Sequence, residues 1–233
     1  DDDIFAEVDR LVPSPRGEFE LTDALEPAIS RGVMCAVPLR CWCDIGAPWN
    51  LLEANEEALS GITADIRGDV EEGVTLKGAV VLPEGSVIRS GTYIEGPCVI
   101  GSGCTIGPHV YIRGHTVIGD DCHIGHASEL KNSVIFPRTK IPHFTYIGDS
   151  VVGSGCNFGA GTKVANLRND KKPVKVNGVS TGRKKFGAVI GDNVLFGINC
   201  SVNVGASVGR DVRVGPHTVV SGTIADESVI GRY

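Results

Sequence analysis

Hydrophobic residues recur at every sixth position through much of the chain. The register is unbroken over twelve positions: Val70, Leu76, Leu82, Ile88, Ile94, Ile100, Ile106, Ile112, Ile118, Ile124, Leu130 and Phe136. The residue four places after each of these, up to position 134, is small or β-branched, and Gly often follows the aliphatic residue directly. The register resumes at Val152 and again from Ile190 to Val220. A period of six fits neither an α-helix nor a simple amphipathic strand.

This period is typical of hexapeptide repeats that wind into a parallel β-helix. Three hexads close one triangular coil of about eighteen residues, and neighbouring coils stack at about the 4.8 Å strand spacing. Residues eighteen apart should therefore lie directly above one another, with the aliphatic residue pointing inward. We expect a mainly-β fold over residues 66–233, in which each coil contacts only its neighbours.

The first 65 residues differ in composition from the rest. They carry fourteen acidic and four basic residues, whereas residues 66–233 carry fourteen acidic and eighteen basic ones. Four of the 31 glycines lie in the first part. We predict a small α/β unit over residues 1–65, with a strand over 33–39 and a helix over 48–59. Sixty-five residues form only a marginal core, so we expect this unit to be part of something larger.

Composition also limits the classes of function. The net charge of −6 argues against a general nucleic-acid binder. No apolar run approaches the roughly 18 residues of a membrane helix, and the acidic start is not a secretory signal. The chain lacks an initiator Met, so we expect a fragment or a processed product. We expect neither a nucleic-acid nor a membrane partner.

Most cysteines occupy the small inward position of the hexad. These are Cys98, Cys104, Cys122, Cys156 and Cys200. We expect reduced thiols packed as small hydrophobic groups, which favours a reducing, cytoplasmic setting. Cys41 and Cys43 form C-x-C without a second pair, which is not a zinc-type spacing. His109 and His143 are 34 apart, but residue 148 is Gly, so the H-x4-H pair that β-helix metalloenzymes use is absent and no metal is expected in the β-helix. His109, His115 and His217 share a turn position and are expected at the surface.

The repeat is interrupted twice, and polar residues gather there. The first interruption, residues 136–152, has five-residue units from Phe136 and Ile147 and contains His143. The second, residues 165–187, has no hexad register and holds seven basic residues against one acidic residue. A projecting basic loop suits a phosphorylated ligand. The alternative is a solvated, mobile loop.

Arg113 and Lys131 lie eighteen residues apart, each directly after an inward aliphatic residue. They should project side by side from adjacent coils. Two like charges at close range are unfavourable unless an anion such as phosphate bridges them. The alternative is two independent surface residues. His143 comes twelve residues after Lys131 and is expected on the next face at nearly the same height.

Three motifs occur together within about 45 residues. They are H-x-x-Y-x-G-D from His143, N-x-G-A-G-T from Asn157, and an N-x5-K spacing from Asn166. With Glu129-Leu-Lys131, they resemble the bifunctional N-acetylglucosamine-1-phosphate uridylyltransferase/glucosamine-1-phosphate acetyltransferase family, above all its archaeal sugar-1-phosphate nucleotidylyltransferase members. The resemblance extends more loosely over residues 66–224. It implies the left hand of the β-helix.

The resemblance implies acetyl transfer from acetyl-CoA to the 2-amino group of an amino-sugar 1-phosphate, most simply glucosamine-1-phosphate, in UDP-N-acetylglucosamine biosynthesis. His143 would be the general base. The implied substrate contacts are Arg113 and Lys131 for the phosphate, and Tyr146, Asn157 and Lys172 for the sugar, with Lys171 as an alternative to Lys172. The implied coenzyme contacts are Ala160, Asn166, Ile198, Pro216 and Arg232. Kinship also implies a homotrimer with its sites between subunits.

The first unit carries a second resemblance. Residues 16–23 and 42–49 look like the last third of a sugar-phosphate nucleotidylyltransferase domain, in which Glu18 matches a sugar contact and Asp44 a magnesium ligand. The Gly-rich phosphate loop of that domain is absent from the sequence. We therefore expect no nucleotidylyl transfer from this chain, and Mg²⁺ only in an intact domain.

Two other functions stay open. The first is a non-catalytic β-helix that trimerises and regulates a nucleotidylyltransferase. The second is acetylation of another small amine or hydroxyl. A pure scaffold would not need His143, Asn157 and the stacked Arg113 and Lys131, so these residues favour the enzyme. The sequence does not distinguish glucosamine-1-phosphate from galactosamine-1-phosphate.

Overall fold

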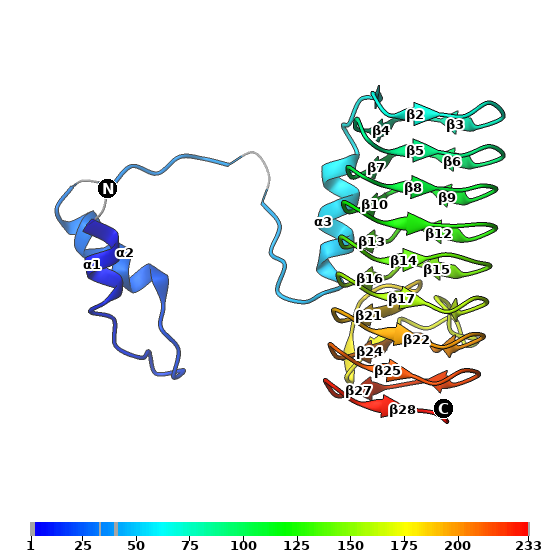
Figure 1. Cartoon of the computed structure of the whole chain (residues 1–233). Helices are drawn as coiled ribbons and strands as arrows, with labels where there is room; N and C mark the ends of the chain where they lie inside the picture. Colours follow the sequence, from blue (N-terminus) through cyan, green and yellow to red (C-terminus); the bar gives the residue numbers. More distant parts are fainter. Residues whose placement is uncertain (1–2, 33, 40–41, 233) are drawn as a thin grey trace. The chain divides into compact units, whose positions relative to one another are not determined.

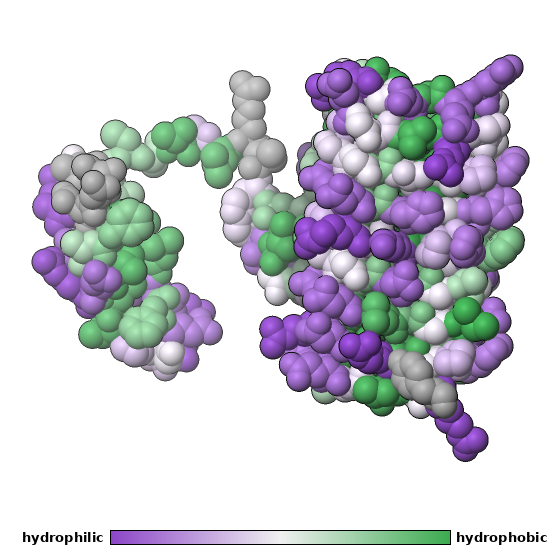
Figure 2. Space-filling model, in the orientation of Figure 1, coloured by the Kyte–Doolittle hydropathy of each residue, from purple (hydrophilic) through white to green (hydrophobic). Residues whose placement is uncertain are grey.

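A computed structural model describes residues 3–32, 34–39 and 42–232, which form two compact units divided between Cys43 and Asp44. In the first unit, helix α1 (Asp3–Val8) packs against helix α2 (Leu21–Ser30), and Ala24 is buried between them. Residues 34–39 form no strand, so the strand expected over 33–39 is wrong there, while residue 33 lies outside the described residues. Figure 2 shows much hydrophobic surface on this unit. Phe19 is among its exposed apolar side chains.

The second unit is a left-handed parallel β-helix built of three sheets, as expected (Figure 1). Sheet A comprises β1 (Asp65–Ile66), β4 (Val80–Leu82), β7 (Cys98–Ile100), β10 (Thr116–Ile118), β13 (Val134–Ile135), β16 (Val151–Val152), β21 (Ala188–Ile190), β24 (Ala206–Val208) and β27 (Thr223–Ile224). Sheet B comprises β2 (Asp69–Val70), β5 (Val87–Ile88), β8 (Thr105–Ile106), β11 (His123–Ile124), β14 (Lys140–Ile141), β17 (Asn157–Phe158), β22 (Leu195–Phe196), β25 (Arg213–Val214) and β28 (Val229–Ile230). Sheet C comprises β3 (Thr75–Lys77), β6 (Tyr93–Glu95), β9 (Tyr111–Arg113), β12 (Glu129–Lys131), β15 (Tyr146–Gly148), β18 (Lys163–Val164), β23 (Ser201–Val202) and β26 (Val219–Val220).

The core is a stack of inward side chains in register. Ile106 pairs with Ile124, eighteen residues on, and both are fully buried. Phe158 stacks on Phe196 with ring centroids 4.8 Å apart, although the inserted segment separates them in sequence. The five cysteines at the small inward position are all buried, as expected. Burial of the aliphatic column and the parallel hydrogen-bond ladders hold the coils together.

The first shortened unit lies elsewhere than expected. Ile135 is fully buried and occupies the inward position, whereas Phe136 is 40% exposed. The five-residue steps therefore run from Leu130 to Ile135 and from Ile147 to Val152. Both lie where the chain passes from sheet C to sheet A, which we call the C/A corner.

The two shortened turns are stacked at the C/A corner. Their tips are Asn132 and Asp149, with φ of 45° and 51°. Asn and Asp tolerate this left-handed region better than most residues. The shortening therefore places two polar side chains directly one above the other.

Helix α3 (Asn50–Leu59) lies along the side of the stack, against sheet A (Figure 1). Its Leu52 is fully buried in a second cluster. Its other buried members are Val134 and Val151 of sheet A and Val174, Val176 and Phe186 of the inserted segment. The structural boundary thus lies between residues 43 and 44, whereas composition placed it near residue 65. The acidic outer face of α3 made the helix look like part of the first unit.

The inserted segment, residues 165–187, is folded. It forms a hairpin of β19 (Lys175–Val176) and β20 (Val179–Ser180), and Phe186 is buried against Trp49 with ring centroids 6.5 Å apart. The alternative of a solvated loop is therefore wrong for its apolar side, although its lysines remain exposed.

Residues 225–233 lie beyond the last inward residue of the register and were expected to form a C-terminal tail. Their described part instead continues the last coil, because β28 pairs with β25. Among the described residues, the helices are too short and too polar to cross a bilayer.

The corrected register predicts that two neighbouring substitutions lower the free energy of unfolding by unequal amounts. We expect Ile135→Ala to lower the free energy of unfolding by about 2–5 kcal/mol, because it opens a cavity in the aliphatic column. Phe136→Ala should cost less than about 1 kcal/mol, because its ring is partly solvated. Denaturant unfolding followed by circular dichroism measures both, and equal losses would contradict the assigned register.

Candidate active site

Residues at the corner between sheets B and C form one vertical column. His143, Ala160, Ile198 and Pro216 occupy equivalent turn positions in successive coils. The N–H of Gly161 donates to the carbonyl of His143 at 3.1 Å, that of Asn199 to Ala160 at 2.8 Å, and that of His217 to Ile198 at 2.9 Å. Arg232 follows β28 as Pro216 follows β25, which continues the column. The residue expected as base and four expected coenzyme contacts thus share one edge, which we call the B/C corner.

The turn that carries His143 is held from both sides. The hydroxyl of Thr145 donates to the carbonyl of His143 at 2.9 Å. The ammonium of Lys163 donates to the carbonyls of Phe144 and Gly161, in the second case at 3.0 Å. The His143 side chain is exposed on this fixed turn. A rigid backbone with an accessible imidazole suits proton transfer to a bound ligand.

Asn157 lies on the outer face of sheet B, in register with Lys140 and, one coil earlier, His123. Burial lowers the pKa of His123, and the nearby Arg89, His143 and Lys140 lower it further. His123 is therefore neutral at neutral pH. The structure brings Asn157 near the B/C corner, three residues before Ala160.

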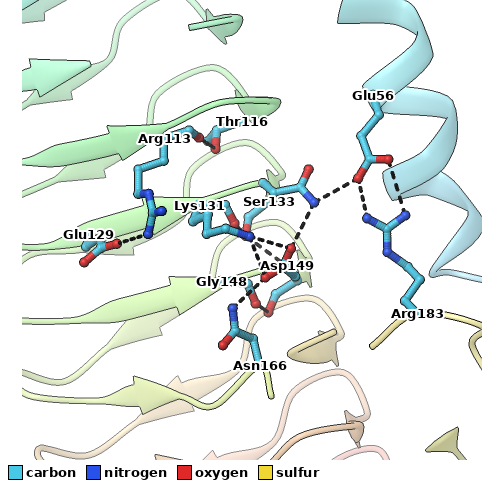
Figure 3. Close-up of polar contacts among 12 residues, drawn as sticks. Glu56, Arg113, Thr116, Glu129, Lys131, Ser133, Gly148, Asp149, Asn166 and Arg183 are labelled. Carbon is cyan, nitrogen blue, oxygen red and sulfur yellow. Dashed lines mark hydrogen bonds and ion pairs between the residues drawn. The ribbon is translucent and has the colours of Figure 1, made fainter. Parts of the chain in front are cut away.

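Arg113 and Lys131 are register partners in sheet C, so they stack as the spacing predicts. Each has a carboxylate partner of its own (Figure 3). Arg113 contacts Glu129 at 3.2 Å, and Lys131 contacts both oxygens of Asp149 at 2.9 and 3.0 Å. The stacking of the two cations therefore does not require an external anion, because these carboxylates already lie beside them, and phosphate binding by the pair stays a prediction.

Asp149 is the centre of a buried polar cluster. Its side chain is only 2% exposed and accepts hydrogen bonds from Lys131, from Asn132 at 3.0 Å and from Asn166 at 2.5 Å. The Asn166 amide also donates to the Tyr146 hydroxyl at 3.0 Å. We call these five residues the Asp149 cluster. Sequence reasoning assigned no role to Asp149 and Asn132, although the D of H-x-x-Y-x-G-D and the five-residue turn were signals for them.

One expected coenzyme contact lies away from the B/C corner. Asn166 follows β18 of sheet C, and its amide contacts Tyr146 and Asp149. Burial raises the pKa of Tyr146, and the charges of Asp149 and Glu129 raise it further. Its hydroxyl thus stays protonated at neutral pH and able to donate.

His143 and Lys131 lie at opposite ends of one face. Lys131 pairs with Gly148, at the end of β15, whereas His143 precedes β15. Five residues of extended chain span about 16 Å at about 3.3 Å per residue. The two groups are at nearly the same height, as expected, and the length of β15 with its preceding turn separates their backbone positions within one chain.

Lys172 lies in the inserted segment, and no contact among the described residues joins it to the Asp149 cluster. Its backbone N–H donates to Asp170 at 3.2 Å. The Arg168 guanidinium binds the same carboxylate at 2.7 and 2.8 Å and lowers its pKa. Lys172, Lys175 and Arg168 line one shallow pocket. The choice between Lys171 and Lys172 stays open.

Magnesium does not fit the residues present. The described part of the chain holds no group of three or more His, Cys, Asp or Glu side chains that could bind a metal. Asp44 and Glu18 are exposed. We therefore derive no step through a metal ion.

Comparison with known proteins agrees with the motifs. The profile of the family described as GMPPB C-terminal domain matches residues 94–181. "Bifunctional protein GlmU" of Methanococcus maripaludis strain C7 is 49% identical over 231 residues, which are 97% of this chain and 56% of the relative. "Bifunctional sugar-1-phosphate nucleotidylyltransferase/acetyltransferase" of Sulfurisphaera tokodaii is 44% identical over 225 residues, 94% of this chain and 56% of the relative. The solved "UDP-N-acetylglucosamine acyltransferase from Campylobacter jejuni" is 14% identical with a TM-score of 0.48, over 67% of this chain and 68% of that one.

The fold and the repeats define a hexapeptide-repeat β-helix protein. Within that class, the chain is a relative of the bifunctional sugar-1-phosphate nucleotidylyltransferase/acetyltransferases, which confirms the resemblance drawn from its motifs. It spans about half the length of the relatives that it matches.

We expect loss of the buried Lys131–Asp149 ion pair to destabilise the protein more than loss of the exposed Arg113–Glu129 pair. Asp149→Asn leaves the Lys131 ammonium without a counter-charge in a site where its side chain is only 19% exposed. We expect a loss of about 3 kcal/mol in the free energy of unfolding. Glu129→Gln, at the more exposed Arg113 pair, should cost under about 1 kcal/mol. Similar losses in thermal or denaturant unfolding would show that Asp149 is not the centre of the cluster.

Proposed function

We propose that the β-helix transfers an acetyl group from acetyl-CoA to the 2-amino group of an amino-sugar 1-phosphate, glucosamine-1-phosphate in the first place, within a homotrimer. The observation that carries this proposal is the B/C corner. There His143 stacks in one column with Ala160, Ile198 and Pro216, the positions where kinship implies the coenzyme. The relatives' printed names, which include an acetyltransferase, support the same class of reaction.

The coenzyme would lie along the B/C corner. Ile198 is 49% exposed there and offers an apolar contact, while the exposed backbone of the turns offers polar ones. Arg232, one coil further, would meet a phosphate of the coenzyme. This direction leaves the thioester at the His143 end of the column.

His143 would act as general base. Its imidazole would take a proton from the neutral 2-amino group of the substrate as the nitrogen of that group attacks the thioester carbonyl. The C–S bond then breaks, the acetamide forms, and the imidazolium returns the proton to the departing coenzyme A thiolate. An imidazole can hold and release this proton near neutral pH.

Arg113 and Lys131 would hold the sugar phosphate. Glu129 engages one nitrogen of the guanidinium, so most of its five N–H donors stay available. The Lys131 ammonium keeps a third proton beyond the two directed at Asp149. Tyr146 and Asn157 would position the sugar ring, and Lys172 or Lys171 would approach from the inserted segment.

Kinship implies a site shared between subunits, and the placement of His143 and Lys131 at opposite ends of β15 is compatible with it. In a homotrimer, His143 of one chain would face the Arg113 and Lys131 end of a second.

The product would enter UDP-N-acetylglucosamine biosynthesis. The described thiols form no disulfide, which favours a reducing compartment such as the cytoplasm.

Release of free coenzyme A in the presence of glucosamine-1-phosphate tests the reaction. We expect His143→Ala to lower kcat by about 10²–10⁴, the usual contribution of a general base. His109→Ala, at a turn of the same corner two coils earlier, is the matched control and should keep kcat within about threefold. Wild-type protein without turnover would support the scaffold function instead. Turnover with another amine only would replace the substrate, which parallel assays with galactosamine-1-phosphate also address.

Mixed trimers test the shared site. His143→Ala and Lys131→Ala chains are each expected to be inactive alone. Refolded together in equal amounts, they should form about one intact site in four, because each group is then drawn from a different chain. Recovery of about a quarter of wild-type turnover supports the arrangement. No recovery would mean that both groups act within one chain.

A further inference from the structure

We propose that helix α3 positions the substrate-binding lysine through a relay of hydrogen bonds, from Glu56 through Asn132 and Asp149 to Lys131. The inference rests on the proposed function, because that function assigns Lys131 to the sugar phosphate. Glu56 and Asn132 are positioning residues in this scheme, since neither would touch the substrate.

The relay is continuous (Figure 3). The Nδ2 of Asn132 donates to Glu56 Oε1 at 2.9 Å and to Asp149 Oδ1 at 3.0 Å. The same Asp149 carboxylate receives the Lys131 ammonium at 2.9 and 3.0 Å. Helix and lysine, 75 positions apart in sequence, are thus joined by a single amide and a single carboxylate.

The amide of Asn132 is oriented by the two carboxylates alone. Asn132 is 8% exposed, and its Oδ1 is buried without a hydrogen-bond partner among the described residues. A buried oxygen without a hydrogen bond is unfavourable, so the surroundings of Oδ1 do not explain why the Asn132 amide takes this orientation. The two protons of Nδ2 supply that reason, because each meets an acid. Removal of the Glu56 acceptor would free the amide to rotate toward a partner for Oδ1.

Glu56 is itself fixed as an anion. Burial alone would raise its pKa, but hydrogen bonds from Arg183 and Asn132 outweigh burial and lower it below its ordinary value. Arg183 comes from the inserted segment and forms an ion pair with Glu56. The helix and the inserted segment therefore jointly hold the acceptor that orients Asn132.

Asp149 transmits this orientation to the lysine. Asn132 and Lys131 share its Oδ1, and Asn166 with Lys131 binds Oδ2. With all four contacts in place, the plane of the Asp149 carboxylate is held in a single orientation. Without the Asn132 contact, Oδ1 keeps only the lysine, so the carboxylate can turn and carry the ammonium with it.

Neighbouring residues of α3 provide a matched comparison. Asn55 also binds the β-helix, by donating to the carbonyl of His115 at 2.8 Å, and among the described residues no hydrogen bond joins its side chain to the Asp149 cluster. Glu56→Ala should raise KM for glucosamine-1-phosphate about tenfold, with KM for acetyl-CoA and kcat within about twofold of wild type. Glu56→Gln keeps an acceptor oxygen and should restore most of the loss. Asn55→Ala should leave all three constants within about twofold.

A purely structural role for Glu56 predicts a different result. The proposal is overturned if KM for the sugar phosphate is unchanged in Glu56→Ala. It is also overturned if both KM values rise together, or if Asn55→Ala has the same effect.

A readout without turnover separates this inference from the proposed function. In protein labelled with ¹⁵N-asparagine, the side-chain amide of Asn166 reports on the far side of Asp149. Its resonance should shift in Glu56→Ala and stay in place in Asn55→Ala. If the wild type is inactive, the proposed function fails, and a shifted resonance still supports the relay. An unshifted resonance overturns the relay whatever the activity.

Discussion

The fold depends on the stacking of inward aliphatic side chains in strict register, coil upon coil. Each coil alone is too small to bury a core, so its stability comes from the neighbours above and below. That constraint explains why the column stays apolar along its length, with Phe158 stacked on Phe196 among the aliphatic residues, and why small residues, five of them Cys, fill the positions between. It also means that any departure from six residues must be absorbed at a corner, away from the column.

The two five-residue steps are such departures, and both fall at the C/A corner. Asn132 and Asp149 take the left-handed conformation that residues such as His115 also take in the unshortened turns, and the loss of one residue leaves these two polar residues stacked at the tips. A buried carboxylate is unfavourable unless charged partners and donors surround it. Lys131, Asn166 and Asn132 meet that need, and the polar cluster is therefore fixed by the shape of the coil.

The candidate site is divided between two corners of sheet C. The imidazole and the expected coenzyme positions share the B/C corner, whereas the cations and their acids share the C/A corner. Strand β15 lies between them within one chain, and the homotrimer implied by kinship would bring the two corners of different chains together. Helix α3 and the inserted segment, both outside the repeat, meet at Glu56 and Arg183 beside the second corner. The two elements that lie outside the hexapeptide repeat, helix α3 and the inserted segment, thus meet beside the corner where the repeat is shortened.

The sequence by itself determined the β-helix, its coil length, the stacking of Arg113 on Lys131 and the family, because a six-residue period and closely spaced motifs are local patterns. It placed the inward residue one position too late, at Phe136 instead of Ile135, and so put the first shortened step one unit too late, because two adjacent apolar residues look alike without burial. It assigned α3 to the wrong unit, because charge reports on the solvent side of a helix and not on the face that packs. Only the tertiary structure decided that Asp149, Asn132 and Glu56 meet Lys131, since hydrogen bonds between residues far apart in sequence depend on how the coils, helix and inserted segment pack.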